Sequence, residues 1–326
     1  MSASSWDRRL VLSSRVSNVC KNKCPHCFAK SDCPIDFIDQ EKVFNFVNRV
    51  ILPSRDQFGH VMMSFMGGEI TQLPYEQVEN YILGLIKLFT DNKIYPSTRV
   101  LTEGNYDGEV WDDLFSKIIK FDRSTAKLHH MRKDPVVRCG GVHFTVNRYT
   151  YTPKVIRNIK KIHSESDFIN IGFTYDKGLK LDFFKMFFDD LGFFDNKFTF
   201  SLANRKRMDT LEMPVCSPPA LWREIEEAFN VKLQVNTHDD GALCNKDSQM
   251  HRIILNPNGT IVPDPMFPAE PVKSKLLSRF DAVRLDDIQS LKQLEETEIY
   301  RWAKGVINMY GGCGRCPIEL WIEENK

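Results

Sequence analysis

The sequence predicts an α/β fold, a partial (βα)6 barrel resembling part of a TIM barrel, followed by a small C-terminal α+β domain. Two observations predict it. Apolar strand-like runs alternate with amphipathic helix-like segments through about residue 207, and after "PVCSPPA" (214–220) this alternation ends. We therefore expect one domain over residues 1–210 and a second over 211–326. Functional residues should lie in the loops after the strands, where parallel sheets bind their ligands.

The elements follow in order along the chain. Strands are expected where short β-branched and aromatic runs end in turn residues. These runs are 9–19, 59–69, 98–105, 140–148, 168–175 and 197–205. Helices are expected where apolar residues recur every three or four positions, at 40–51, 75–92, 109–120, 154–163 and 181–192. In the C-terminal part we expect a helix at 221–229, a short strand at 231–236, a hairpin at 252–264 around an Asn-Gly turn, and a helix at 291–307.

Composition excludes several classes of protein. The 326 residues carry a net charge of +1, so nothing indicates the basic excess of a nucleic-acid-binding protein. No run approaches the roughly 18–20 apolar residues of a membrane span, and the N-terminus lacks the apolar core of a secretory signal. Nine cysteines without such a signal indicate a reducing compartment, in which clustered thiols are metal ligands. We expect a cytoplasmic protein.

Three of the cysteines lie in one loop after the first expected strand. Cys20, Cys24 and Cys27 have the spacing C-x3-C-x2-C. Three thiolates suit a [4Fe–4S] cluster with one iron left open for a small molecule. The alternatives are a zinc loop with a distant fourth ligand, or cysteines that are close together by chance.

Two further motifs follow the next two strands. "MGGEIT" (66–71) ends the second, and "TEGN" (102–105) ends the third. With the cysteine loop, in which His26 occupies the usually aromatic position before Cys27, these motifs resemble those of the radical S-adenosylmethionine (SAM) superfamily. The resemblance covers residues 9 to about 207. Ile70 stands where that family commonly has proline.

The resemblance implies a role for each of these residues. The amino and carboxylate groups of SAM would bind the open iron, and the glycine turn would approach the methionyl part closely because neither glycine has a Cβ. A carboxylate after the turn would accept a hydrogen bond from the amino group. On the fourth strand a Ser/Thr-x-Asp/Asn pattern would contact the SAM carboxylate or ribose, although alternating polar residues are also simply one face of a strand. The implied SAM-binding residues are His26, Gly67, Gly68, Glu69, Thr145 and Asn147.

The resemblance also implies a reaction. The reduced cluster would cleave SAM to a 5′-deoxyadenosyl radical, which abstracts hydrogen from a substrate carbon. The electron would come from an external low-potential donor such as flavodoxin or ferredoxin. Oxidation, epimerisation or bond formation would follow.

The C-terminal cysteines resemble the SPASM/twitch extension of such enzymes over residues 244 to 317. Cys244 precedes the expected hairpin, and Cys313 and Cys316 form "CGRC". In that extension four cysteines hold an auxiliary [4Fe–4S] cluster, but Asp264 occupies the fourth position here. Asp264 could be the ligand, Cys216 could replace it, or the position could stay open for substrate. Otherwise these cysteines hold zinc or no metal.

Two further groups are weaker candidates. Cys139, just before the fourth strand, could donate hydrogen to a substrate radical, or it is a small buried side chain. Arg205 and Arg207, after the sixth strand, could clamp a substrate anion, or they belong to a solvated loop.

The sequence does not name the substrate. The absence of a recognisable peptide-binding module at the N-terminus favours a small molecule such as an amino sugar or nucleoside. The alternative is a maturase that modifies a peptide or protein. A third hypothesis, from another class, is a non-enzymatic zinc or iron–sulfur binding or sensing protein, which would not need the "GGE" turn.

Overall fold

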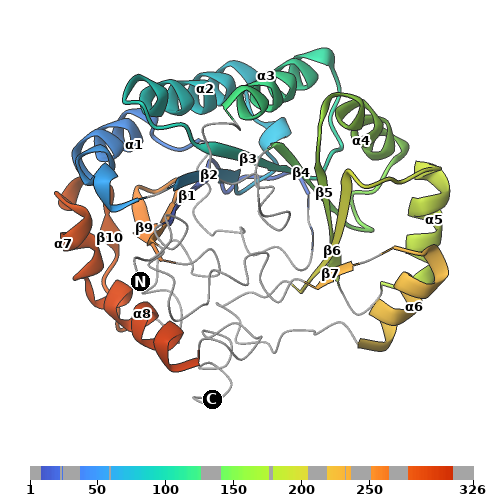
Figure 1. The fold of residues 1–326 in the computed structure, drawn as a ribbon. Coiled ribbons are helices and arrows are strands. Elements are labelled where there is room, and N and C mark those ends of the chain that lie inside the picture. Colours follow the sequence, from blue (N-terminus) through green and yellow to red (C-terminus); the bar gives the residue numbers. More distant parts are fainter. Residues whose placement is uncertain are drawn as a thin grey trace, which may run out of the picture.

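The computed structural model describes residues 9–22, 24, 37–58, 60–125, 141–175, 179–204, 219–231, 233–235, 251–263 and 278–310. Their strands form one sheet in the order β10-β9-β8-β1-β2-β3-β4-β5-β6-β7. Pairing is parallel from β8 to β7, and antiparallel only where β9 and β10 extend the sheet. Figure 1 shows the sheet as an open arc with helices along its outer side. The predicted partial (βα)6 barrel is confirmed, because each of β1 to β6 is followed by a helix.

The bounds of the elements are close to those predicted. The strands are β1 Arg9–Arg15, β2 His60–Met66, β3 Ser97–Thr102, β4 Gly141–Val146, β5 Ile169–Tyr175, β6 Phe198–Asn204, β7 Leu233–Val235, β8 His251–Leu255, β9 Thr260–Val262 and β10 Val283–Arg284. The helices are α1 Gln40–Phe46, α2 Tyr75–Asp91, α3 Glu109–Thr125, α4 Pro153–Glu165, α5 Leu181–Leu191, α6 Pro219–Phe229, α7 Leu291–Glu295 and α8 Glu298–Tyr310.

The hydrophobic core lies between the sheet and the outer helices. On β5, Ile169, Ile171 and Phe173 are fully buried, and the Phe173 ring lies 4.9 Å from the rings of both Phe184 and Phe187 on α5. Because side chains alternate along a strand, every second residue of β5 faces the inside of the arc. This alternation fixes which residues face a ligand and which face the core.

The inner face of the arc carries polar side chains. Asn170 and Thr174 of β5 alternate with the core residues, and Ser201 of β6 lies opposite Gly172 in the strand register. The side chains on the inner face are therefore more polar than the branched apolar side chains that fill the interior of a closed barrel.

Two helices differ from the prediction. The segment expected as one helix at 291–307 is two, because α7 ends at Glu295 and α8 starts at Glu298. Between them the Thr297 hydroxyl donates to the Leu294 carbonyl, a bond that competes with helix continuation. The helix predicted at 40–51 continues beyond α1 as a π-helical turn, Val47–Ile51, and a 3₁₀ turn, Leu52–Gln57.

The C-terminal strands join the same sheet as the barrel strands. β8 lies parallel to β1, with Leu12 opposite Ile253, and the predicted hairpin is confirmed by the antiparallel pairing of β8 with β9. Gly259 closes its turn at φ +75°, a conformation that favours glycine. The division of the chain near residue 210 stays a prediction. No helix in the described ranges is long and apolar enough to cross a membrane.

Candidate functional site

The loops after β1, β2, β3 and β4 meet at one end of the sheet. Val16, just after β1, donates its backbone N–H to the Met66 carbonyl at the end of β2 (2.8 Å). The next contact joins the Gly68 N–H to the Ser17 carbonyl (2.7 Å). The glycine turn and the chain entering the cysteine loop therefore lie side by side.

Gly67 and Gly68 are required by this close approach. A Cβ at Gly67, whose φ is +126°, would lie 2.4 Å from the Ser17 carbonyl oxygen, and a Cβ at Gly68 would lie 2.0 Å from that of Val19. Both distances are far below van der Waals contact. The glycines predicted from the motif are thus needed for the turn to pack against the cysteine loop. Their predicted approach to SAM stays a prediction.

Cys20 and Cys24 are the described members of the cysteine triplet, and both are of intermediate exposure. Burial raises the pKa of the Cys20 thiol, while hydrogen bonds from the backbone N–H groups of Asn22 and Glu69 lower it. These N–H groups stabilise a thiolate at this position. The loop is also held by the Lys21 N–H, which donates to Gln72 Oε1 (2.7 Å).

Glu69 is buried behind the glycine turn, at 7% exposure. Its Oε1 accepts from the hydroxyls of Thr71 (2.7 Å) and Thr102 (2.6 Å), and its Oε2 accepts from the Glu103 N–H (2.7 Å). Burial raises the pKa of Glu69, and these hydrogen bonds lower it. The carboxylate is therefore fixed in one orientation between β2 and β3.

A second buried carboxylate, Glu103, was not predicted as a site residue, although it lies within the "TEGN" motif. It is 6% exposed, and its carboxylate accepts from Asn22 Nδ2 in the cysteine loop and from Gln72 Nε2 after the glycine turn (3.5 Å). Burial, followed by repulsion from Glu69, raises the pKa of Glu103 to about 7. The available sequence signal was a glutamate in the motif that follows each of β2 and β3, Glu69 in "MGGEIT" and Glu103 in "TEGN".

The β4 side of the site is formed by the turn at 147–150. Asn147 is buried, and its Oδ1 accepts from the backbone N–H groups of Tyr149 (2.9 Å) and Thr150 (3.2 Å). This turn presents Thr150 to Glu103. Thr145 lies two residues earlier, on the inner face of the strand. Contacts of Thr145 and Asn147 with SAM stay predictions.

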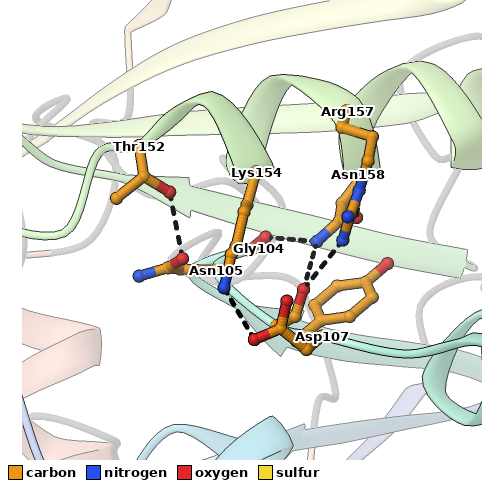
Figure 2. Close-up of polar contacts among 8 residues, drawn as sticks. Gly104, Asn105, Asp107, Thr152, Lys154, Arg157 and Asn158 are labelled. Carbon is orange, nitrogen blue, oxygen red and sulfur yellow. Dashed lines mark hydrogen bonds and ion pairs between the residues drawn. The ribbon is translucent and has the colours of Figure 1, made fainter.

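The loop after β3 is held in place by helix α4 (Figure 2). Asn158 Nδ2 donates to the carbonyls of Gly104 (2.7 Å) and Tyr106 (3.0 Å), and Lys154 forms an ion pair with Asp107 (2.6 Å). Gly104 adopts φ +80°, and a Cβ there would lie 2.8 Å from the Phe144 ring. The residue that follows Glu103 is therefore fixed from two sides.

The remaining predicted site residues lie outside the described part of the chain. They are His26, Cys27, Cys139, Arg205, Arg207, Cys216, Cys244, Asp264, Cys313 and Cys316. Within the described residues, no three His, Cys, Asp or Glu side chains gather closely enough to hold a metal ion. The triplet's metal role and the auxiliary cluster therefore stay predictions.

Comparison with known proteins identifies the fold. No protein-family model matches the sequence, and no curated protein matches it either. Solved structures do match. One is anSMEcpe with bound AdoMet (S-adenosylmethionine) and the Cp18Cys peptide, with a TM-score of 0.58 and 13% identity over 92% of this chain and 83% of that one. The fold is that of radical SAM enzymes.

SuiB from Streptococcus suis has the same fold. Bound to the precursor peptide SuiA, it matches with a TM-score of 0.57 and 14% identity over 92% of this chain and 67% of its own. Bound to S-adenosylmethionine, SuiB matches with a TM-score of 0.56 and 13% identity over 93% of this chain and 68% of its own. The resemblance predicted from the three motifs is thus confirmed for the fold.

Proposed function

We propose that this protein is a radical SAM enzyme that acts on a peptide. The observation that carries the proposal is the meeting of the cysteine loop, the glycine turn and two buried carboxylates at the carboxyl ends of adjacent parallel strands. Ligands bind at this end of such sheets. A zinc-binding or sensing protein would not need the glycine turn or these carboxylates.

The described residues fit the cofactors that this function requires. The Cys20 sulfur accepts hydrogen bonds from the backbone N–H groups of Asn22 and Glu69, which suits a sulfur ligand of an iron–sulfur cluster. A [4Fe–4S] cluster bound by Cys20, Cys24 and Cys27, when reduced, supplies the electron that cleaves SAM. Glu69 is held so that its carboxylate can bind the SAM amino group. The Cys244, Asp264, Cys313 and Cys316 set is proposed for an auxiliary cluster.

A peptide is favoured over the amino sugar or nucleoside expected from the sequence. Two solved structures with this fold hold peptides, the Cp18Cys peptide in anSMEcpe and the precursor peptide SuiA in SuiB. Their chains are also covered to 83% and 67% by this one, so the similarity extends beyond a barrel core. The small-molecule substrate becomes the second candidate.

Anaerobic reconstitution tests the enzyme proposal. The protein is loaded with iron and sulfide, reduced with dithionite and given SAM, and 5′-deoxyadenosine is measured. Cys20→Ala should abolish its formation, whereas Cys33→Ala, at a cysteine outside both proposed ligand sets, should not. A fully loaded protein that forms no 5′-deoxyadenosine would overturn the proposal.

The iron content tests the auxiliary cluster. About four irons per chain indicate one cluster and about eight indicate two. If Asp264 is a ligand, Asp264→Ala should lower the count.

Peptides encoded beside the gene test the substrate. The matching peptide should increase 5′-deoxyadenosine formation and change in mass when incubated with the loaded, reduced enzyme and SAM. Stimulation by amino sugars or nucleosides but by none of the peptides would restore the small-molecule hypothesis.

A further inference from the structure

Three buried polar atoms lie together on the inner face of β5 and β6. Asn170 Oδ1, Thr174 Oγ1 and Ser201 Oγ have no hydrogen-bond partner within the described part of the chain. Their residues are only 8%, 1% and 0% exposed. Because buried polar groups are nearly always paired, three such atoms in one place indicate that a polar ligand binds beside them.

The strand register places these three side chains around Gly172. Asn170 and Thr174 lie two residues before and after it on β5, and Ser201 lies opposite it on β6. A Cβ at Gly172 would lie 3.4 Å from Ser201 Oγ. Gly172 is of intermediate exposure, although both of its neighbours on β5 are buried. Helix α5 covers the outer side of β5 (Figure 1), so the exposed surface of Gly172 faces the inside of the arc.

The chemistry of the three side chains suits a neutral ligand that both donates and accepts hydrogen bonds. None of them carries a charge, so a carboxylate or ammonium group would be buried here without a counter-charge. A peptide amide offers one N–H and one C=O, so it can donate to Asn170 Oδ1 and accept from a hydroxyl. A glycine within a strand also lets a second backbone approach the sheet closely.

The three side chains lie beside the residues expected to bind SAM. Gly172 is opposite Thr145 of β4 in the register, and Thr145 is predicted to contact SAM. The 5′-deoxyadenosyl radical of the proposed reaction must touch the carbon from which it abstracts hydrogen, so the substrate lies directly beside SAM. Resting on the proposed function, we infer that Asn170, Thr174 and Ser201 bind a backbone amide of the substrate peptide over Gly172.

Peptide kinetics test this inference in the cluster-loaded, reduced enzyme with SAM. The probe is the peptide encoded beside the gene that stimulates 5′-deoxyadenosine formation by wild type. Ser201→Ala and Thr174→Val each remove one hydroxyl, and each should raise the KM for this peptide about three- to ten-fold. Gly172→Ala places a methyl group where the amide binds, and should raise the KM more than about ten-fold. Gly172 does not adopt a positive φ, so its backbone accepts alanine.

Thr98 provides a matched control on the opposite face of the sheet. Its Oγ1 is also buried and has no partner among the residues described, but Thr98 lies opposite the core residue Met63 in the register. Thr98→Val therefore removes an equivalent hydroxyl and should keep the wild-type KM. Calorimetry without reductant measures SAM binding by all four variants, which should change by less than about three-fold.

Each contrary outcome has a distinct meaning. Wild-type KM values in Ser201→Ala and Thr174→Val would overturn the inference, and these two variants decide it if Gly172→Ala does not fold. Equal losses of SAM and peptide affinity would mean that the three side chains bind SAM, and would overturn it as well. So would a KM raised equally in Thr98→Val, which would show a general effect on the sheet. Failure of every such peptide to stimulate wild type would instead overturn the proposed peptide substrate, and with it the inference that rests on it.

Discussion

At Gly68 the glycine turn and the cysteine loop approach each other too closely for any side chain. A Cβ there would lie 2.0 Å from the Val19 carbonyl oxygen, one residue before Cys20. The oxygen belongs to the backbone, so it cannot rotate away as a flexible side chain would. The cysteine loop must move if Gly68 carries a methyl group.

We therefore expect Gly68→Ala to reduce iron uptake strongly and to lower the melting temperature. The control is Gly305→Ala in α8, where an added Cβ would meet nothing within 4 Å. It should keep wild-type iron content and raise stability by about 0.5–1 kcal/mol, because alanine favours the helix. Iron analysis and thermal unfolding measure both. Normal iron uptake by Gly68→Ala would contradict the close approach.

Buried polar atoms on the inner face of β5 and β6 form a second residue-scale feature. The Ser201 hydroxyl, at 0% exposure, and the Thr174 hydroxyl, at 1%, have no hydrogen-bond partner among the described residues. Such groups cost about 1–3 kcal/mol each when left unpaired. Neither packs in the apolar core, since both alternate with core residues along their strands.

Ser201→Ala should consequently stabilise the ligand-free protein by about 1 kcal/mol. The matched control is Ser14→Ala, because the Ser14 hydroxyl bonds the buried Tyr81 hydroxyl (2.7 Å) and its loss leaves Tyr81 unpaired. That control should be destabilised. Denaturant unfolding measures both. A loss of stability in Ser201→Ala would show that a water or another group pairs with the hydroxyl.

The motif residues of the site were predictable, but their partners were not. Gly67, Gly68 and Glu69 follow from one short motif. Asn22, Gln72 and Thr150 reach Glu103 only because four strand ends are aligned by the register of the sheet. Register depends on packing over the whole sheet, so a single sequence does not fix such cross-loop contacts.

Among the elements, helix α4 positions the end of β3. Asn158 is 1% exposed and satisfies two backbone carbonyls of the loop that follows Glu103 (Figure 2). Lys154 contacts the same loop, but its ion pair with Asp107 is exposed, with side-chain exposures of 46% and 73%. Buried and exposed contacts from one helix can thus be compared directly.

Asn158→Ala should lower the free energy of unfolding by about 1–3 kcal/mol, because it removes the donor of the Gly104 carbonyl and one of the two donors of the Tyr106 carbonyl, which keeps Arg157 Nη2 (3.1 Å). Lys154→Ala should change it by less than about 1 kcal/mol, since exposed ion pairs contribute little. Chemical denaturation of the two variants provides the comparison. Equal losses would indicate that the loop is not held by Asn158.

Helix α3 holds the starts of β3 and β4 through one carboxylate. Asp122 accepts from the N–H groups of Thr98 (3.0 Å) and Gly141 (2.9 Å). Burial raises the pKa of Asp122 to about 8, from 3.8 in an unfolded chain, and the two hydrogen bonds lower it only in part. The folded state therefore binds this proton more tightly than the unfolded state does.

Because the folded pKa is the higher one, the contribution of Asp122 to stability is fully present below about pH 4 and is lost as the pH rises towards about 8. Asp122→Asn cannot titrate, so its free energy of unfolding should fall less steeply with pH over this range than that of wild type. It should also be less stable at low pH, because an amide supplies one acceptor for two N–H donors. Parallel pH profiles for the two proteins would exclude this role.

At the scale of the whole molecule, strands β1 to β6 could be predicted from the sequence, whereas the extension of their sheet by β8, β9 and β10 could not. The alternation of strands and helices predicts β1 to β6, because each helix must cover the strands beside it. The strands after residue 210 were read as a separate small domain. Nothing in their apolar pattern shows that β8 pairs with β1, some 240 residues earlier.

The C-terminal segment contributes directly to the burial of β1. Ile253 of β8 lies opposite Leu12, and Asn256 accepts from the buried Arg15 (2.8 Å). Arg49 donates to the carbonyls of Leu285 (2.7 Å) and Ile288 (3.0 Å). A chain that ends at residue 210 would expose the β1 edge and leave Arg15 without Asn256.

We expect a fragment of residues 1–210 to aggregate or to lack cooperative unfolding, because an exposed apolar strand edge promotes association. A fragment of residues 1–263 keeps β8 and β9 against β1, so it should be more soluble and should unfold at a higher temperature than the shorter fragment. Circular dichroism, thermal unfolding and size-exclusion chromatography compare the two with the full chain. If the 1–210 fragment unfolds cooperatively near the melting temperature of the full chain, the predicted boundary marks an independent domain, and the pairing of β1 with β8 adds little to its stability.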